Sequence, residues 1–173
     1  MKTTISQPAT STMMYDTEND ISQKSRAELN ALMNQRLANA VDLQMQIKQA
    51  HWNVKGPHFI GLHELFDQID EEVESYVDLI AERIVQLGGI AEGTVRLAAK
   101  RSRLEEYPTA ISEGMAHVEA VARALSTFGR EARLTIGETD ALGDADTVDL
   151  FTEISRGVDK WLWFVEAHTQ ASK

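Results

Sequence analysis

Histidine and carboxylate side chains recur at helical spacing in the middle of the sequence. Titratable residues separated by three or four positions run through this segment: His63, Asp67, Glu71, Glu74, Asp78 and Glu82. On an α-helix this spacing places all six side chains on one face. An acidic stripe is ordinarily a solvated face, but the histidine at its head adds a nitrogen ligand and indicates metal binding as the alternative. The sequence contains no cysteine, so a metal site here can use only nitrogen and oxygen ligands.

The stripe contains two pairs that could each bind a cation. His63 with Asp67, and Asp78 with Glu82, are four residues apart, so each pair meets on the helix face. The separation of His63 from Asp78 corresponds to about 22 Å along a helix, which is too far for one ion. If the helix packs antiparallel against a second copy about a two-fold axis, each pair lies opposite the other pair of the neighbour. The pattern therefore favours two equivalent sites shared between two chains.

His51 is the third candidate nitrogen or oxygen ligand of the first pair. It continues the helix face of Gln44 and Ile47, where a lone histidine is ordinarily a satisfied core residue. Beside His63 and the carboxylates it becomes a credible ligand. Two imidazoles with three carboxylates suit Fe(II), Mn(II) or Zn(II) better than calcium or magnesium. Iron is preferred, because a carboxylate-rich shell stabilises the ferric product more than the ferrous reactant.

Long amphipathic helices are predicted to position these residues. Apolar residues recur at steps of three and four in four segments, which predicts helices at about residues 25–53, 62–87, 108–134 and 146–168. Ser25 and Glu28 have the spacing of a capping box, and Gly88 and Gly89 are typical of a helix end. Pro108 is predicted to open the third helix. The fold class is therefore all-α, a four-helix bundle with a short helix in one crossover connection.

The composition bounds the class of protein further. Residues 1–21 are rich in Ser and Thr and lack apolar periodicity, so we expect a flexible N-terminal tail before a bundle domain at residues 22–173. No run approaches the roughly 18 to 20 apolar residues that span a bilayer, so a soluble, cytoplasmic protein without a membrane partner is expected. The net charge of −10 favours cations over polyanions as partners.

At this point the sequence resembles the Dps family, the DNA-binding proteins from starved cells, which are ferritin-like mini-ferritins. Three segments carry the resemblance: "KQAHWNVKG", "FIGLHELFDQIDEEVESYVDLIAERIVQLGG" and "DTVDLFTEISRGVDKWLWFVEAH". The resemblance implies a hollow homododecamer that oxidises Fe(II), preferably with hydrogen peroxide, stores ferric mineral and protects against oxidative stress. It also implies a ferroxidase centre at the site inferred above, with these ligands from two chains: His51, His63 and Asp67 of one, and Asp78 and Glu82 of the other.

The resemblance implies roles for residues beside the ferroxidase centre. Trp52 adjoins His51 and is expected either to donate or trap an electron near the iron or to fill the dimer interface. The region of Asp144, Asp146 and Asp149 lines the pores through which iron enters similar shells, although acids at a helix N-terminus are also ordinary caps. Asp149, one turn inside the helix, is the preferred pore residue. Trp161 and Trp163 are assigned to packing.

Other features leave alternatives open. Residues 1–20 contain one basic residue, Lys2, and three acidic residues, Asp16, Glu18 and Asp20, and the last residues add only Lys173. DNA binding requires several cationic contacts, so we expect it to be weak or absent. The alternatives to iron turnover are a DNA-compacting, nucleoid-associated protein with secondary iron chemistry, and a shell that binds zinc or manganese at the same site without turnover. The remaining histidines, His58, His117 and His168, receive no metal role, and an exposed position is expected for His58 and His117.

Overall fold

A computed structural model describes residues 13–170. The regular elements among the described residues are all helices, and the β pairing there is limited to an isolated bridge between Lys55 and Glu113. This confirms the all-α prediction. The helices are α1 (Gln23–Asn53), α2 (Phe59–Gln86), α3 (Val95–Arg101), α4 (Gly114–Ala141) and α5 (Ala145–Gln170). Within the described part of the chain, no helix has the length and apolarity needed to cross a membrane.

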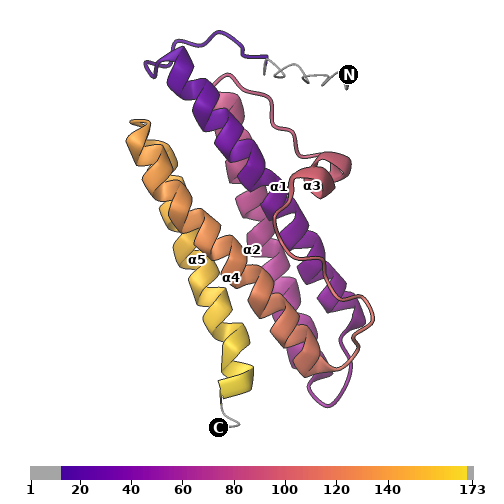
Figure 1. The fold of residues 1–173 in the computed structure, drawn as a ribbon. Coiled ribbons are helices and arrows are strands. Elements are labelled where there is room, and N and C mark those ends of the chain that lie inside the picture. Colours follow the sequence, from indigo (N-terminus) through magenta and orange to yellow (C-terminus); the bar gives the residue numbers. More distant parts are fainter. Residues whose placement is uncertain (1–12, 171–173) are drawn as a thin grey trace, which may run out of the picture.

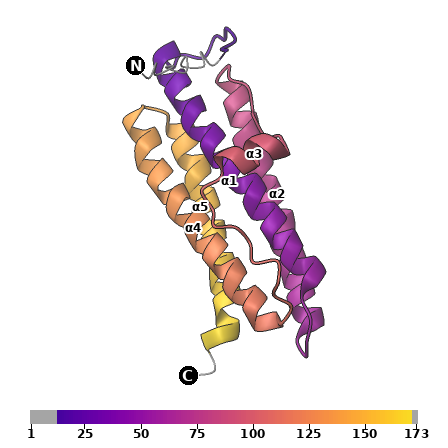
Figure 2. The same cartoon turned by 45° about the vertical axis from the view of Figure 1, so that its right-hand side comes forward.

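The four long helices form a bundle of two antiparallel pairs. α1 packs against α2, and α4 packs against α5, while α1 also contacts α4. In Figure 1 the chain descends through α1, returns through α2, ascends again through α4 and descends through α5. Helices α2 and α4 run in the same direction, so the chain must cross the length of the bundle between them. This crossover carries α3, which packs on the outer side of α1 (Figure 2).

Local chemistry sets the ends of the first two helices. Helix α1 begins at Gln23, directly after its N-cap Ser22, and not at the predicted cap Ser25. The Ser22 side chain accepts a hydrogen bond of 3.1 Å from the backbone N–H of Ser25. The predicted end of α1 at residue 53 is confirmed. Helix α2 ends before Gly88, whose φ of +79° lies in the left-handed region that favours glycine, as the sequence predicts.

The start of the third long helix was predicted too early. Residues 108–113 are not helical, and α4 begins at Gly114. The backbone at the end of this segment pairs with the residues that follow α1, since the Lys55 N–H donates to the carbonyl of Ser112 at 3.1 Å. Just before the segment, the Gln46 side chain of α1 donates to the carbonyl of Glu105 at 2.9 Å. These tertiary hydrogen bonds override the helix signal of Pro108 and attach the crossover to α1 and the residues after it.

The bundle core contains the apolar faces that the periodicity predicted. All predicted core residues of α2 are buried except Val77, which is partly buried. Trp161 is buried at 6% exposure, but the packing assignment of Trp163 is wrong within the described chain, where that side chain is 61% exposed. His117 was also predicted wrongly as an exposed residue, because its side chain lies fully inside the bundle.

The segment ahead of α1 is partly attached to the bundle. The first twelve residues of the predicted tail lie outside the described residues. Residues 13–22 contain no helix, but the Tyr15 N–H donates to the carbonyl of Gly88 at 2.7 Å. Arg26 adds hydrogen bonds to the carbonyls of Ile21 and Leu87. This part of the predicted tail is therefore held against the end of α2.

Candidate metal centre

His51 and His63 meet where the last turn of α1 faces the first turns of α2. Their rings stack with centroids 3.7 Å apart. Each Nδ1 lies 2.9 Å from the backbone carbonyl oxygen of the other histidine. A carbonyl oxygen only accepts, so each neutral ring carries its proton on Nδ1 and donates it across the pair. The two helices therefore hold the two imidazoles in a fixed, reciprocal arrangement.

This arrangement determines which ring nitrogens can bind a metal. With Nδ1 protonated and committed to a carbonyl, the lone pair of each imidazole is on Nε2. Backbone carbonyls that accept from the second nitrogen are the usual means by which proteins orient metal-binding histidines. His51 is mostly buried and His63 is half-buried, and both belong to ordered helix. The structure thus fixes the orientation of both imidazoles and leaves Nε2 of each as the nitrogen that could bind a metal.

Asp67 adds a carboxylate to the histidine pair and is already paired with a cation. Its Oδ1 lies 3.7 Å from Nδ1 of His51 and 2.8 Å from Nζ of Lys48. The hydrogen bond from Lys48 holds the pKa of Asp67 below its ordinary value, and the bonds to Asp67 and then Asp70 raise the pKa of Lys48. Asp67 is therefore ionised at neutral pH, as a metal ligand must be.

Lys48 and Asp70 are functional candidates that the sequence analysis missed. Nζ of Lys48 lies 2.9 Å from Oδ2 of Asp70, which is buried at 7% exposure. The other oxygen, Oδ1, has no hydrogen-bond partner among the described residues. Because Lys48 is one turn before His51 on α1, its spacing could have indicated a neighbour of the site. A cation bound by Asp67 must share that carboxylate with Lys48 or displace it.

Asp78 and Glu82 lie on the same helix but outside this cluster. Both side chains are exposed, and neither makes a hydrogen bond or ion pair to a described residue. Within residues 13–170, no three histidine or acidic side chains are close enough to hold one metal ion. The structure thus places His51, His63 and Asp67 beside one another without forming a three-ligand metal site, and it leaves Asp78 and Glu82 apart from them.

Apolar side chains are exposed along the surface that carries these ligands. Trp52, beside His51, is 64% exposed, Ile60 is 60% exposed and Val85 is 57% exposed. Val85 lines an apolar groove with Glu82 and Ala91. The predicted ligands on α2 and these apolar side chains are thus exposed together on the surface of the single chain.

The predicted pore residues divide into one buried and two exposed side chains. Asp144 is 2% exposed, with Oδ1 2.7 Å from Nη2 of Arg83 and 3.2 Å from the N–H of Thr147. It caps α5 and is not available as a pore ligand, which corrects its assignment to the pore. Asp146 and Asp149 are exposed, and Asp146 lies 3.7 Å from Nη1 of Arg83.

The remaining histidines lie in two different surroundings. His58 and His168 are exposed, as expected for His58, and line one surface pocket between the start of α2 and the end of α5. His117 is fully buried beside Tyr107. None of the three joins the cluster of His51 and His63.

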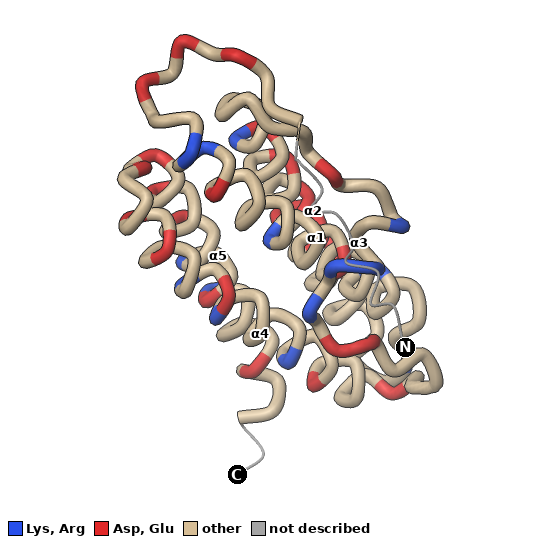
Figure 3. Tube along the Cα trace, turned by 45° about the horizontal axis from the view of Figure 1, so that its top comes forward, with Lys and Arg blue, Asp and Glu red and all other residues tan. Residues whose placement is uncertain are grey.

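Acidic positions outnumber basic ones over the bundle. Figure 3 shows Asp and Glu along the helices and in the segment that precedes α1. The sequence contains 27 acidic residues against 17 Lys and Arg. Such a surface attracts metal cations and repels nucleic acid unless basic residues cluster locally.

The fold and the paired histidines define a ferritin-like protein. The family profile described as the ferritin-like domain matches residues 30–173. A DNA protection during starvation protein from Agrobacterium fabrum is 40% identical over 156 residues, which cover 90% of this chain and 96% of that relative. The chain belongs to the Dps family, the DNA protection during starvation proteins.

Solved structures agree with this assignment. Mycobacterium smegmatis Dps has a TM-score of 0.85 and 32% identity, with 90% of this chain and 94% of that chain covered. DpsA14 from Streptomyces coelicolor has a TM-score of 0.86 and 30% identity, covering 91% and 93% of the two chains. These similarities confirm the predicted ferritin-like bundle with a crossover. The family resemblance drawn from the three sequence segments is confirmed with it.

Proposed function

We propose that the protein is a ferroxidase that oxidises Fe(II) with hydrogen peroxide and stores the ferric product in a shell of its own copies. The observation that carries this proposal is that the predicted ligands form two separate groups on the single chain. Two histidines and Asp67 form one preoriented group, while Asp78 and Glu82 are exposed and unpaired among the described residues. An antiparallel contact between two α2 helices would join each group to the complementary group of a second chain.

The surface around these ligands supports such a contact. Trp52, Ile60 and Val85 are large apolar side chains that remain exposed on the single chain. Burying them against a second copy would remove apolar area from water, which is the main driving force of stable association. Under this proposal Trp52 lies at the dimer interface and also adjacent to the ligand His51. Assembly into a dodecamer follows from the family and is part of the proposal.

The ligand set suits the proposed reaction. Iron is the substrate, and imidazole with carboxylate ligands binds Fe(II) and then favours the higher charge of Fe(III). Two Fe(II) ions supply two electrons to one hydrogen peroxide, which takes up two protons and yields two waters. This pairing avoids one-electron reduction of peroxide to hydroxyl radical. Protection against oxidative damage is the expected physiological result.

Two further features belong to the proposal. Asp67 is ionised beside Lys48, and iron binding replaces this internal cation with the metal. Asp149 and Asp146, both exposed at the start of α5, are the proposed residues of a path for cations into the shell.

The second candidate function is DNA binding, which is favoured because similar proteins are named DNA protection during starvation proteins. The charge distribution argues against it, because the net charge is −10 and counterion release requires several cationic contacts. A gel shift at low salt separates the two functions, and clear retardation would support a DNA-compacting role. Zinc or manganese binding without turnover remains the other alternative, which titration calorimetry beside an oxidation assay distinguishes.

The double variant His51→Ala with His63→Ala tests the ferroxidase proposal. Stopped-flow mixing with Fe(II) and hydrogen peroxide should show oxidation no faster than in buffer, because both nitrogen donors are lost. The matched control is His58→Ala with His168→Ala, which removes two exposed histidines outside the cluster and should retain wild-type oxidation. Light scattering checks that both variants keep the assembly. Undiminished oxidation by the first variant would refute the proposal.

A further inference from the structure

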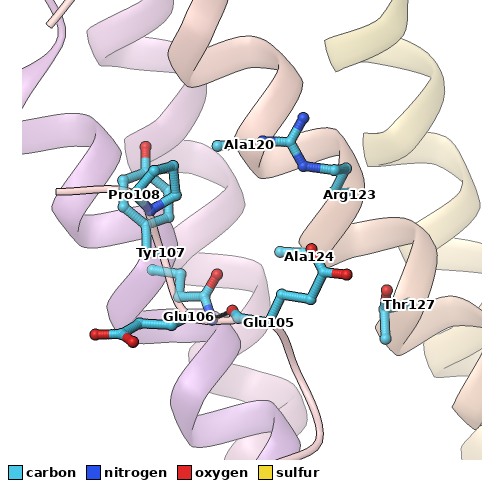
Figure 4. A pocket seen from close by; sticks show the side chains of 9 residues that line it. Glu105, Glu106, Tyr107, Pro108, Ala120, Arg123, Ala124 and Thr127 are labelled. Carbon is cyan, nitrogen blue, oxygen red and sulfur yellow. Dashed lines mark hydrogen bonds between the residues drawn. The ribbon is translucent and has the colours of Figure 1, made fainter. Parts of the chain in front are cut away.

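Tyr107 and His117 form a hydrogen-bonded pair inside the bundle. The Tyr107 hydroxyl lies 2.6 Å from Nδ1 of His117, and the two rings are nearly parallel, with centroids 6.1 Å apart. Tyr107 comes from the crossover segment and is 8% exposed, whereas His117 belongs to α4 and is fully buried. Figure 4 shows Tyr107 with Pro108, Arg123 and their neighbours around a cavity of about 250 Å³. The proposed metal centre uses neither residue.

Burial fixes the charge state of this pair. It raises the pKa of Tyr107 above its ordinary value, so the phenol stays protonated. Burial also lowers the pKa of His117, with a smaller opposing effect from the Asn53 backbone, so the imidazole stays neutral near pH 7. The phenol therefore donates its proton to a neutral imidazole. A phenol that loses an electron becomes a strong acid, and a base at this distance can take its proton at once.

The pair adjoins the end of α1 that carries His51 and Trp52. His117 lies close enough to the backbone of Asn53 for that residue to raise its pKa, although Nε2 of His117 has no hydrogen bond of ordinary geometry to any described residue. The start of α4 also packs on this end, since a Cβ placed on Gly114 would lie 3.4 Å from the carbonyl oxygen of Lys55. Packed protein therefore connects the phenol with the last turn of α1.

We propose that Tyr107 is a proton-coupled electron donor that intercepts one-electron oxidants inside the bundle, with His117 as its proton acceptor. A hydroxyl radical takes one electron from the phenol and, with one proton from solvent, becomes water. The phenolic proton moves to Nδ1 of His117, which leaves a neutral phenoxyl radical beside an imidazolium. A reductant returns the electron, and the proton moves back. In the cell that reductant is Fe(II), which becomes Fe(III); only this last role rests on the proposed ferroxidase function.

Tyr76 provides an internal comparison. It is also buried, and its hydroxyl donates to Oε1 of Glu72 at 3.0 Å. This hydrogen bond is longer than the one from Tyr107 to His117, which measures 2.6 Å, so the Tyr76 proton has farther to move to its acceptor. The proton of an oxidised Tyr76 is therefore taken up less readily. Tyr107 should be the preferred site of radical formation.

Pulse radiolysis of the iron-free assembly with the azide radical tests the proposal without ferroxidase activity. The azide radical becomes azide by taking one electron, and the phenoxyl radical is followed by its absorbance. The variants are made in a Tyr15→Phe background, because Tyr15 is exposed and would react directly with the azide radical. There, Tyr107→Phe should lose most of the phenoxyl signal, Tyr76→Phe should retain most of it, and His117→Phe should form phenoxyl more slowly. The wild-type rate should fall in heavy water, because proton transfer accompanies electron loss.

Mass spectrometry of the oxidised wild-type protein keeps the test valid if a variant does not fold. Tyr107 should carry more oxidation than Tyr76, although both are buried. An equal phenoxyl yield in Tyr107→Phe, or Tyr107 left unmodified while Tyr76 is consumed, would overturn the proposal. Because no iron is present, these results are independent of whether the protein is a ferroxidase.

Discussion

The two ligand groups of α2 differ in how much the single chain does to prepare them. At the start of the helix, His63 and Asp67 are oriented by contacts with α1, through the paired carbonyls and through Lys48. Near its end, Asp78 and Glu82 extend from the surface with no partner among the described residues. This difference supports the proposal that the two groups complete each other in a site shared between two chains.

The residue after Glu82 sharpens this contrast. Arg83 turns inward, with Nη2 2.7 Å from Oδ1 of the buried Asp144 and Nε 3.0 Å from Oγ1 of Thr147. Adjacent residues of α2 thus differ: Arg83 forms a buried ion pair that stabilises the fold, and Glu82 is exposed without an ion pair to a described residue. Asp144 is buried and stabilises the fold, whereas Asp78 and Glu82 are exposed and available to the proposed site.

The largest predicted effect is on the acidic group. Asp78→Asn with Glu82→Gln removes two carboxylate ligands and should reduce peroxide-driven Fe(II) oxidation to the buffer rate. Stability should stay within about 0.5 kcal/mol of wild type, as for exposed positions without contacts. The checks are stopped-flow absorbance and urea denaturation. Rapid oxidation by this variant would show that the histidine group works alone.

Arg83→Met should have the opposite effect, a large loss of stability with little change in Fe(II) oxidation. Removing one partner of a buried ion pair leaves Asp144 uncompensated, which costs about 3–5 kcal/mol. Urea denaturation measures this loss. The rate of Fe(II) oxidation per folded protein should remain near wild type, because the ion pairs of Arg83 are with Asp144 and Asp146 and not with a proposed ligand of the ferroxidase centre. A variant of unchanged stability would contradict the structural role of this pair.

A smaller effect is expected for Lys48→Met, which removes the cation that competes for Asp67. Cobalt titration should show metal binding a few-fold tighter than in wild type, because the carboxylate no longer has to leave an ammonium. Lys55→Met, an exposed position beyond the end of α1, is the matched control and should leave the affinity unchanged. Weaker binding in Lys48→Met would mean that Lys48 orients Asp67 rather than competing for it.

The same variant has a defined pH dependence. The lowered pKa of Asp67 contributes stability above the ordinary value of 3.8, and this is lost as pH falls through the lowered pKa. The raised pKa of Lys48 contributes stability below 10.5, and this is lost as pH rises through the raised pKa. The difference in free energy of unfolding between wild type and Lys48→Met should therefore be largest between about pH 3.8 and pH 10.5, and it should become smaller at lower and at higher pH.

Periodicity and spacing predicted the bundle, its crossover helix and the division of the ligands, because helix geometry is local and regular. They failed where tertiary contacts decide the outcome. Residues 108–113 are not helical, and Ser112 accepts a hydrogen bond from Lys55, which follows α1. His117 is buried inside the bundle and paired with a tyrosine ten residues away. The competition of Lys48 for Asp67 also depends on how α1 faces α2, which no spacing within one helix specifies.

Subunit complementation tests the shared site most directly. His51→Ala with His63→Ala inactivates one ligand group, and Asp78→Asn with Glu82→Gln inactivates the other. When the two inactive variants are unfolded, mixed equally and reassembled, each hybrid dimer regains one intact site. The account predicts recovery of about a quarter of wild-type oxidation, since half of randomly formed dimers are hybrid and each restores one of two sites. No recovery in verified hybrid assemblies would contradict a site built from two chains.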